Sequence, residues 1–547
     1  MGVILLCEPL LVNGPLPRGS DVFATCHYLQ GFMKAFGEGD LLPRWTDRSN
    51  QGLGAPSFVL FPPLTFYGAG ISSWITGSII SGFKLYMVLL AILTGCAFYA
   101  LARSWIGPGA PAAVASGLYL LLPYHVLDMY QRFAMSELTS FLFFPLILLF
   151  ARRVMENGGR GEIAGLAIAY AGLVYTHIVS AFLFSLMLGL WLLWEGWGRW
   201  RRLAPVALGL AWGLMLAAPA LLPAVLEKRH VNIAWVLEMP NGDFRINTIF
   251  RDDVLPGLGI KDPVKPPVLR SAHSQLLLAI AAAAIALGGL RGQGRARKDV
   301  VAMLTGCGIA YFLQTGLSTP VWLIVPELRT IQFPWRFQTV MVLTTALLAG
   351  FAIAAAWGPA RGGGARRPAA LLALAALIGV NLYFSRQNAF LKPFDYDEAV
   401  NGRPSVVEWT EPSTTPIAFT DYRSIKGMTL DMPRAAFVQG AGNIRIDSWE
   451  SSSRRLSIDT TTGGTIVLRT FWFPGWEGSL DGGPLDLSPS DGMGAIRFGV
   501  PAGSHTVSLS FEATAERWGA SLLGMVSGLA LLLLCPPLSK LGRGTVR

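Results

Sequence analysis

Residues 15–67 read PLPRGSDVFATCHYLQGFMKAFGEGDLLPRWTDRSNQGLGAPSFVLFPPLTFY, a polar stretch rich in Gly and Pro between apolar runs. It contains the acids Asp21 and Asp47, and one of the six histidines of the chain, His27. Repeated prolines prevent this stretch from forming one continuous helix. We therefore expect a loop here rather than one long helix, and Asp21 is its leading candidate for a functional residue.

The composition indicates a chain that lies mostly in lipid. Of its 547 residues 52% are hydrophobic and only 14% are charged, whereas soluble domains have about 25% charged residues. A net charge of +10 would suit nucleic acid, but the basic residues cluster in short gaps between apolar runs, as in cytoplasmic loops. We therefore expect no nucleic-acid partner. The spacing of the five cysteines fits neither a disulfide framework nor a CxxC metal site.

About eleven to twelve apolar runs predict transmembrane helices. Eleven lie at about 82–103, 110–126, 137–151, 161–177, 178–196, 203–226, 275–290, 299–316, 338–358, 368–385 and 517–538, and a shorter one at 3–12.

The gaps near 152–160, 199–202, 291–298 and 361–367 and the tail 540–547 are short and basic. Counting spans puts all of them on one side, which the positive-inside rule makes cytoplasmic. The outer segments are then 14–81, 127–136, the turn at His177, 227–274, 317–337 and 386–516.

Between Phe394 and Arg517 apolar residues alternate with Thr, Ser and Gly, which predicts strands. We expect them at Arg455–Thr460, Thr465–Phe473, Ala495–Val500 and His505–Phe511, with Gly463-Gly464 as one of the turns. The predicted organisation is a transmembrane domain at 1–390, a C-terminal extracytoplasmic β-sandwich at 391–516, and a last transmembrane helix with a basic tail at 517–547.

Asp21 precedes a helical pattern over 22–36. Asp is a favoured N-cap residue, so two roles stay open for Asp21, a helix cap and a catalytic base. One side chain can serve in both. His27 lies nearly two turns into that helix.

In the second outer segment, Asp128, Arg132 and Glu137 lie near the membrane surface. Glu137 opens a span, where an unpaired charge is costly, so we expect it to pair with Arg132. A purely structural ion pair is the alternative. His177 occupies a tight outer turn, where a structural role is the simpler interpretation.

Four further residues suggest contacts with a substrate. Arg44 suits a phosphate, while its neighbour Trp45 suits either a headgroup or an aromatic-belt anchor. Arg336, next to Trp335, stands before a span, where a guanidinium binds phosphate well or extends to the interface.

Acid clusters at Asp252-Asp253 and at Asp395, Asp397 and Glu398 have the oxygen ligands that divalent cations prefer, although such pairs are common by chance. No P-loop or zinc spacing occurs in a supporting context, which argues against ATP-driven transport.

Several segments together resemble the YfhO-like bacterial membrane proteins, many of which are described as "6-pyruvoyl-tetrahydropterin synthase-related": PRGSD, GDLLPRW, GLGAPSFVLFPPLTFY, RFAMSEL and IQFPWRFQ. The pieces FWFPGWEGSLDGG and VPAGSHTVSLSFE resemble their outer domain. No pterin-enzyme site is evident in the sequence. The group is similar to the GT-C glycosyltransferases. The resemblance implies a GT-C-like fold. It also implies an activity that moves a sugar from a polyprenyl-phosphate donor to an envelope glycan, lipid or protein on the outer face of the bacterial cytoplasmic membrane.

In that superfamily an acid of the first outer loop acts as base or metal ligand, and Asp21 is the matching position. The usual second acid is missing from Ser20-Asp21-Val22-Phe23, which puts Mg or Mn dependence in doubt and favours a monophosphate donor.

The resemblance implies roles for the other residues as well. Glu137 and His27 would assist Asp21, and the substrate-binding candidates are Arg44, Asp128, Arg132, His177, Trp335 and Arg336. In the outer domain, Trp472, Phe473 and Trp476 would either bind the acceptor or form the core.

Two other classes stay open. One is a non-catalytic envelope scaffold or glycan-binding protein, and the other is a transporter of a lipid-linked glycan. A transporter should have charges deep inside its spans, and the sequence has few.

Overall fold

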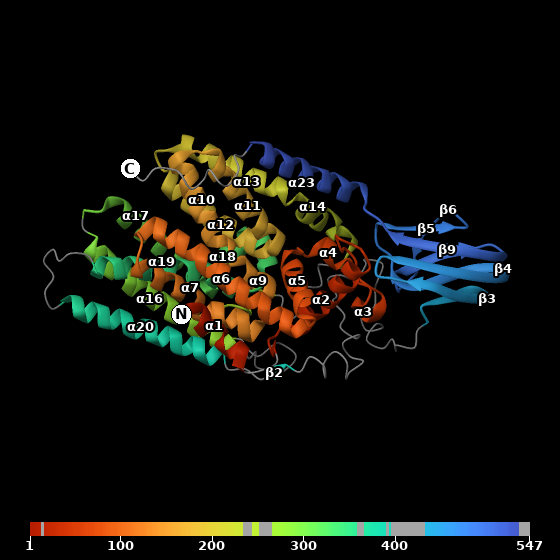
Figure 1. Cartoon of the computed structure of the whole chain (residues 1–547), viewed down its shortest axis with the longest axis horizontal. Helices are drawn as coiled ribbons and strands as arrows, with labels where there is room; N and C mark the ends of the chain where they lie inside the picture. Colours follow the sequence, from red (N-terminus) through yellow and green to blue (C-terminus); the bar gives the residue numbers. More distant parts are fainter. Residues whose placement is uncertain are drawn as a thin grey trace.

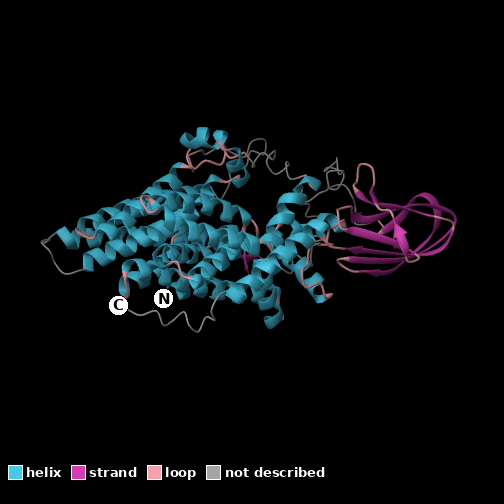
Figure 2. Cartoon of the chain, turned by 90° about the horizontal axis from the view of Figure 1, so that it is seen from above, coloured by secondary structure: helices cyan, strands magenta, loops and turns pink. Residues whose placement is uncertain are grey.

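The computed structural model describes residues 1–12, 16–232, 243–250, 265–290, 292–357, 366–389, 393–394 and 433–534. A body of helices occupies one end and a β-sheet the other, and α23 (Ala515–Leu534) returns from the sheet along the helices (Figure 1). The view from above shows the same division (Figure 2). The acid clusters at Asp252-Asp253 and at Asp395, Asp397 and Glu398 lie outside the described residues.

The first outer loop is largely helical. It contains β1 (Leu16–Pro17), α2 (Val22–Gly37), α3 (Ser49–Gly52), α4 (Ser57–Leu60) and α5 (Leu64–Thr76), and it follows α1 (Gly2–Val12). The helix predicted over 22–36 is thus present as α2. Strand β1 pairs antiparallel with β2 (Pro393–Phe394), which joins this loop to the chain that follows α20.

Most of the body consists of apolar helices, of which several are long and others only one or two turns. They are α6 (Ile79–Ile106), α7 (Ala110–Leu121), α8 (Pro123–Leu127), the π-helix η1 (Asp128–Arg132), α9 (Met135–Ser140), α10 (Phe143–Asn157), α11 (Arg160–Thr176), α12 (Ile178–Gly196), α13 (Leu203–Leu216), α14 (Ala218–Leu226), α16 (Lys265–Gly289), α17 (Gly294–Phe312), α18 (Thr319–Ile324), α19 (Gln338–Trp357) and α20 (Arg366–Ala389). Short 3-10 turns complete it: η2 (Trp200–Arg202), η3 (Glu227–His230), η4 (Gly316–Ser318), η5 (Pro326–Ile331) and η6 (Pro334–Phe337).

Among the described residues, six helices are long and apolar enough to cross a membrane, or up to eight if each of two bent pairs is one span. This is fewer than the eleven to twelve predicted. The run at 161–177 forms a helix of 17 residues, α11. The run at 203–226 is broken by a 72° bend, because Pro219 at the start of α14 lacks the N–H that would continue α13.

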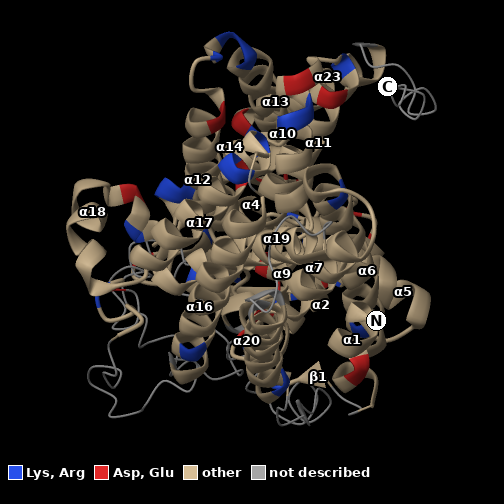
Figure 3. Cartoon of the chain, turned by 90° about the vertical axis from the view of Figure 1, so that its left-hand side faces the viewer, with Lys and Arg blue, Asp and Glu red and all other residues tan. Residues whose placement is uncertain are grey.

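Polar contacts connect three of the short basic gaps at the end of the body opposite the sheet, where Arg202 of the 199–202 gap donates to the carbonyl of Met155 at 3.1 Å. Arg295 pairs with Glu156, and Lys298 lies 3.7 Å from Glu195. Nearby, the buried Arg152 donates to Asp299. Figure 3 views the molecule from this end. These gaps therefore share one end, as the positive-inside rule requires.

The C-terminal strands form one seven-stranded antiparallel sheet among the described residues, so the predicted two-sheet sandwich is not found. Its strands are β3 (Ala435–Trp449), β4 (Ser453–Phe471), β5 (Trp476–Leu480), β6 (Gly483–Leu485), β7 (Ser488–Pro489), β8 (Ala495–Val500) and β9 (Gly503–Phe511). Their order is β6-β5-β9-β4-β8-β7, with β3 also on β4.

Two of the predicted strands are halves of β4. Strand β9 pairs with Ser453–Thr460, β8 pairs with the half after Gly463, and β3 runs along both halves. The turn predicted at Gly463-Gly464 is therefore a bend inside one strand. Gly463 has φ +71°, which glycine adopts at little cost. A continuous partner strand thus prevents the chain from reversing there.

The sheet packs onto the first outer loop. Trp45 is only 1% exposed and belongs to the buried core of the sheet, with its ring 5.4 Å from that of Trp476. It is therefore neither an aromatic-belt anchor nor a headgroup contact. Phe473 and Trp476 are buried in the same core, so of their two predicted roles the structure supports packing. Where the chain leaves the sheet, Arg517 donates to the buried Glu227 at 2.7 Å, and this contact fixes the start of α23.

Candidate functional site

Four segments of the chain meet around a cavity of about 190 Å³. Its lining combines acids, arginines and a histidine with an aromatic wall: Asp21, Ala24, Thr25, Tyr28, Phe61, Pro62, Phe66, Arg132, Ala134, Met135, Ser136, Glu137, Thr176, His177 and Arg336. These residues come from the first outer loop, the α8–α9 segment, the α11–α12 turn and η6. Four outer segments predicted separately thus share one cavity.

Asp21 occupies the N-cap position of α2, but its side chain makes no capping hydrogen bond. The carboxylate accepts a hydrogen bond from Ser20 Oγ at 2.9 Å, and its Oδ2 lies 4.0 Å from Arg132 Nη2. The side chain is 46% exposed. Of the two roles left open by the sequence, the side-chain cap is therefore not formed, and the carboxylate lines the cavity instead.

The backbone holds Asp21 against the second outer segment. The amide of Asp21 donates to the carbonyl of Arg132 at 2.8 Å, and that of Ser20 to Gln131 at 3.0 Å. The accepting carbonyls lie at the end of the π-helix η1, a rare element that often marks functional sites. Phe133, which ends η1, has φ +57°, an unusual conformation for a residue with a bulky side chain.

Gly19 makes this approach sterically possible. A Cβ atom added to Gly19 would lie 2.7 Å from the carbonyl carbon of Arg132 and 2.7 Å from Phe133 Cβ. We expect Gly19→Ala to displace Asp21 from Arg132 and to destabilise the protein by about 1–3 kcal/mol, a typical cost of overpacking. Gly37→Ala in the same loop is the matched control, because nothing lies within 4 Å of its added Cβ. Thermal unfolding in detergent checks this, and equal melting temperatures for both variants would contradict it.

Arg132 connects three buried partners through its Nη1 atom. It donates to Asp128 Oδ1 at 2.6 Å, to Glu137 Oε2 at 2.8 Å and to Tyr124 Oη at 3.0 Å. Tyr124 in turn donates to Glu137 Oε1 at 2.8 Å. Glu137 thus pairs with Arg132, as the sequence predicts. Because Nη1 serves these partners, Nη2 is the guanidinium nitrogen that faces Asp21.

Arg336 and His177 complete the polar side of the cavity. Arg336 Nε lies 3.4 Å from Glu137 Oε2, and its Nη1 donates to the carbonyl of Ile331 at 2.8 Å. His177 caps α12: its Nδ1 accepts from the amide of Ser180 at 3.3 Å. In the neutral ring, Nε2 therefore carries the proton and is a hydrogen-bond donor. The structure thus combines the capping role of His177 with a place in the cavity lining.

The structure does not bring four of the candidate residues to the cavity surface. His27 is buried against Ser49, with Nε2 3.1 Å from its hydroxyl oxygen, and burial lowers its pKa to about 4. Arg44 donates to the carbonyls of Phe58 and Pro219, both at 3.0 Å, and so ties the loop to α14. Trp335 is buried and stacks on Phe333 at 4.7 Å, while Asp128 lies behind Arg132.

Three important residues have no clear signal in the sequence. Tyr124 closes the buried network, Gly19 permits the loop contact, and Phe61 lines the aromatic wall. A tyrosine before the polar DMYQR segment was the available hint for Tyr124. For Gly19 and Phe61, only the packing of distant segments assigns a role.

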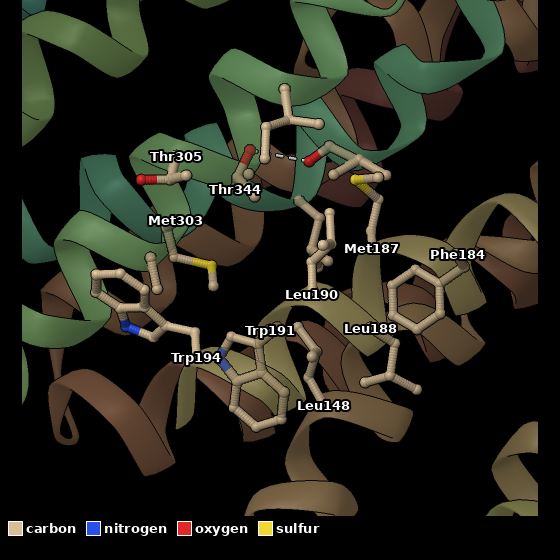
Figure 4. Close-up of a pocket in the computed structure, with 15 residues that line it drawn as sticks. Leu148, Phe184, Met187, Leu188, Leu190, Trp191, Trp194, Met303, Thr305 and Thr344 are labelled. Atoms are coloured by element: carbon tan, nitrogen blue, oxygen red, sulfur yellow. Dashed lines mark hydrogen bonds between the residues drawn. The ribbon is translucent and has the colours of Figure 1, made fainter. Parts of the chain in front are cut away.

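A second, apolar cavity of about 230 Å³ lies deeper in the body, between α10, α12, α17 and α19. Phe184, Leu188 and Trp191 line it from α12, and Thr344 from α19 (Figure 4). Phe184 follows His177 by seven residues, two helical turns, so both lie on the same face of α12 and about 10 Å apart along its axis. The apolar cavity therefore begins about two turns of α12 beyond His177.

Among the described residues, no group of three or more His, Cys, Asp or Glu side chains is arranged to hold a metal ion. The acids at the polar cavity already have arginine partners within 4.0 Å.

Several solved structures are similar to this chain, among them the following two. The arabinofuranosyltransferase AftD from mycobacteria matches with 16% identity and a TM-score of 0.43, over 72% of this chain and 27% of AftD. ArnT from Cupriavidus metallidurans, solved with bound undecaprenyl phosphate, matches with 14% identity and a TM-score of 0.31, over 65% of this chain and 76% of ArnT. No curated protein sequence matches the chain.

One protein family matches more than half of the chain. Its description is "6-pyruvoyl-tetrahydropterin synthase related domain; membrane protein", and the match covers residues 58–387. This range includes most of the helical body and, of the residues that line the polar cavity, all those contributed from Phe61 onward. The chain therefore belongs to the family of membrane proteins related by name to 6-pyruvoyl-tetrahydropterin synthase, in agreement with the resemblance noted in the sequence.

Proposed function

We propose that this protein is a membrane glycosyltransferase that moves a sugar from a polyprenyl-phosphate donor to a cell-envelope glycan, lipid or protein. One observation carries the proposal. The half-exposed carboxylate of Asp21 lies 4.0 Å from the Arg132 guanidinium in a cavity that Arg336 and His177 also line, and α12 leads from His177 to an apolar cavity about two turns further on. A base, a set of cationic and neutral donors, and a place for a lipid chain are what this reaction requires.

In this mechanism Asp21 accepts the proton of an acceptor hydroxyl as that oxygen attacks the anomeric carbon of the sugar. The new glycosidic bond forms while the bond between the anomeric carbon and the phosphate oxygen breaks, and the electron pair leaves with the phosphate. Arg132 Nη2, Arg336 and His177 Nε2–H stabilise the charge that develops there. The products are the glycosylated acceptor and the lipid phosphate.

The two cavities suit a ligand with a polar head and an apolar tail. From His177 to Trp194, α12 descends about 26 Å through the body, and the apolar lining extends to Trp194. A prenyl chain on this face would bury apolar surface at about 25 cal/mol per Å². Its phosphate would then lie at the level of His177 and Arg336.

We place the reaction on the outer face of the bacterial cytoplasmic membrane, since the short basic gaps lie at the opposite end of the body. A single acid at Asp21 supports a monophosphate donor that needs no metal. Mg or Mn bound through acids such as Asp252 or Asp395 is the alternative, and activity after chelation distinguishes the two.

Transfer by the purified protein in lipid nanodiscs tests the proposal. Polyprenyl-phosphate donors that carry different radiolabelled sugars are presented with envelope extracts, and labelled acceptor is measured. A scaffold would transfer no label. A transporter would move the donor across a sealed vesicle without forming a new glycosidic bond.

Arg336 should matter for the donor rather than for the acceptor. We expect Arg336→Ala to weaken the binding of decaprenyl phosphate by about ten- to a hundredfold, the range for hydrogen bonds to charged groups, with little change in the KM for the acceptor. Arg329→Ala is the control from the same outer segment, since Arg329 lies outside the cavity lining. An equal loss for donor and acceptor would contradict a phosphate role.

A further inference from the structure

Part of the lining of the polar cavity is aromatic. Tyr28, Phe61 and Phe66 all line the cavity, with the ring of Tyr28 5.4 Å from Phe61 and 6.0 Å from Phe66. Tyr28 and Phe66 are buried, but Phe61 is 37% exposed. One large ring is thus left uncovered on a wall that its neighbours hold in place.

The backbone presents Phe61 rigidly. Phe61 ends α4 in an extended conformation, with φ −104° and ψ 133°, and Pro62 and Pro63 follow it. A residue that precedes proline is restricted to such conformations. The backbone that carries the ring is therefore held in one conformation before any ligand binds, which lowers the entropy lost on binding.

Helix α2 sets the distance between this wall and the carboxylate. Asp21, Ala24, Thr25 and Tyr28 lie three, four and seven positions apart, so they share one face. The acid and the aromatic ring are separated by about 10 Å along the helix. Only the small side chains of Ala24 and Thr25 lie between them, which leaves room for one ring-sized ligand.

The charges of the cavity restrict the kind of ring. Its two arginines, Arg132 and Arg336, face the two acids Asp21 and Glu137, and Asp128 adds a third acid behind Arg132. The arginines are thus already balanced before a donor phosphate arrives. A second negative charge on the sugar would lie near carboxylates, and like charges at an interface are strongly unfavourable.

We propose that Phe61 and Tyr28 form a platform for the sugar ring of the donor and that the site selects neutral sugars. This inference rests on the proposed function, because it assigns the sugar subsite of the same reaction. The apolar C–H face of the ring packs on Phe61, and the anomeric carbon then faces Arg132 and Asp21. Uronic acids are excluded by charge.

Binding to the full-length protein in nanodiscs tests the platform. The probes share one tail: decaprenyl phosphate; its glucosyl, galactosyl and mannosyl derivatives; and its glucuronosyl derivative. We expect at least one neutral glycolipid to bind more tightly than the bare lipid phosphate, and the glucuronosyl lipid to bind at least about tenfold more weakly than the glucosyl lipid.

Phe61→Leu should weaken the binding of the preferred neutral glycolipid by about three- to tenfold, which is the size of a typical aromatic contact. The affinity for decaprenyl phosphate should stay the same. Phe61→Tyr keeps a ring and should retain the preference. Phe36→Leu, an exposed phenylalanine of α2 outside the cavity lining, should change nothing. An equal loss for glycolipid and bare lipid, or no preference for any neutral sugar, would overturn the platform.

Asp21→Asn separates this inference from the proposed function, because it removes the base but leaves the platform. It should keep the sugar preference and lose transfer. A wild-type protein that shows the preference but transfers no sugar would refute the transferase and leave the platform standing. Normal transfer by the wild-type protein, together with a Phe61→Leu variant that keeps the wild-type sugar preference, would refute the platform and leave the transferase standing.

Discussion

Asp21→Asn is expected to lower the rate of sugar transfer by about 10²–10⁴-fold, the usual contribution of a positioned general base. The amide keeps the shape of the side chain and can still accept a hydrogen bond from Ser20, but it cannot take up the proton of the acceptor. Since the carboxylate is half exposed and makes no capping hydrogen bond, the fold should tolerate the change. Single-turnover transfer with saturating donor measures the chemical step directly.

Asp40→Asn provides the control for this experiment. Asp40 belongs to the same outer loop, lies outside the cavity lining, and accepts a hydrogen bond from the amide of Leu42 at 3.0 Å. The Asn side chain can accept the same bond, so transfer should be unchanged. Full activity of Asp21→Asn would remove Asp21 from the mechanism, and equal losses in both variants would point to a general disturbance of the loop.

Arg132→Met is expected to have the largest effect on stability. It leaves Asp128 without its cation and Glu137 with only the more distant Arg336. Removing one partner of a buried ion pair typically lowers the free energy of unfolding by about 3–5 kcal/mol. Transfer should also fall by at least about 10²–10³-fold, because Arg132 Nη2 no longer stabilises the leaving phosphate. Denaturant unfolding in detergent and the transfer assay measure the two effects separately.

The double variant Arg132→Met/Asp128→Asn distinguishes stability from chemistry. It removes one charge of each sign and leaves Glu137 with Arg336 as the remaining pair, 3.4 Å apart. We expect it to recover much of the lost stability but none of the lost transfer. Recovery of transfer would show that Arg132 acts through folding alone. A stable, active single variant would refute both roles.

The sequence predicted much of this site, because a charge at a membrane boundary needs a partner nearby. Glu137 opens a span and Arg132 precedes it by five residues. Their pairing therefore followed from the free-energy cost of an unpaired charge in the membrane. The positive-inside rule assigned the segments that contain Asp21, His177 and Arg336 to one side. The cavity contains all five of these residues. Local helical pattern was sufficient to predict α2.

His27, Arg44 and Trp45 show where such reasoning fails. All three are polar or aromatic residues of the first outer loop, which made them plausible ligands. In the structure His27 bonds to Ser49, Arg44 to the carbonyls of Phe58 and Pro219, and Trp45 packs against Trp476. The partners of Arg44 and Trp45 include residues about 175 and 430 positions away, and no local pattern encodes those contacts.

By itself, the sequence of this protein determined that it is a membrane protein with several apolar helices, that three of its short basic gaps share one end, and that Asp21, Arg132 and Glu137 lie together away from them. Composition and the cost of unpaired charge are local properties, so they can be read residue by residue. Only the tertiary structure decided that Gly19 lets Asp21 approach Arg132, that Tyr124 closes the network, and that β4 bends instead of turning. These features depend on which distant segments pack together, and packing is a property of the whole fold.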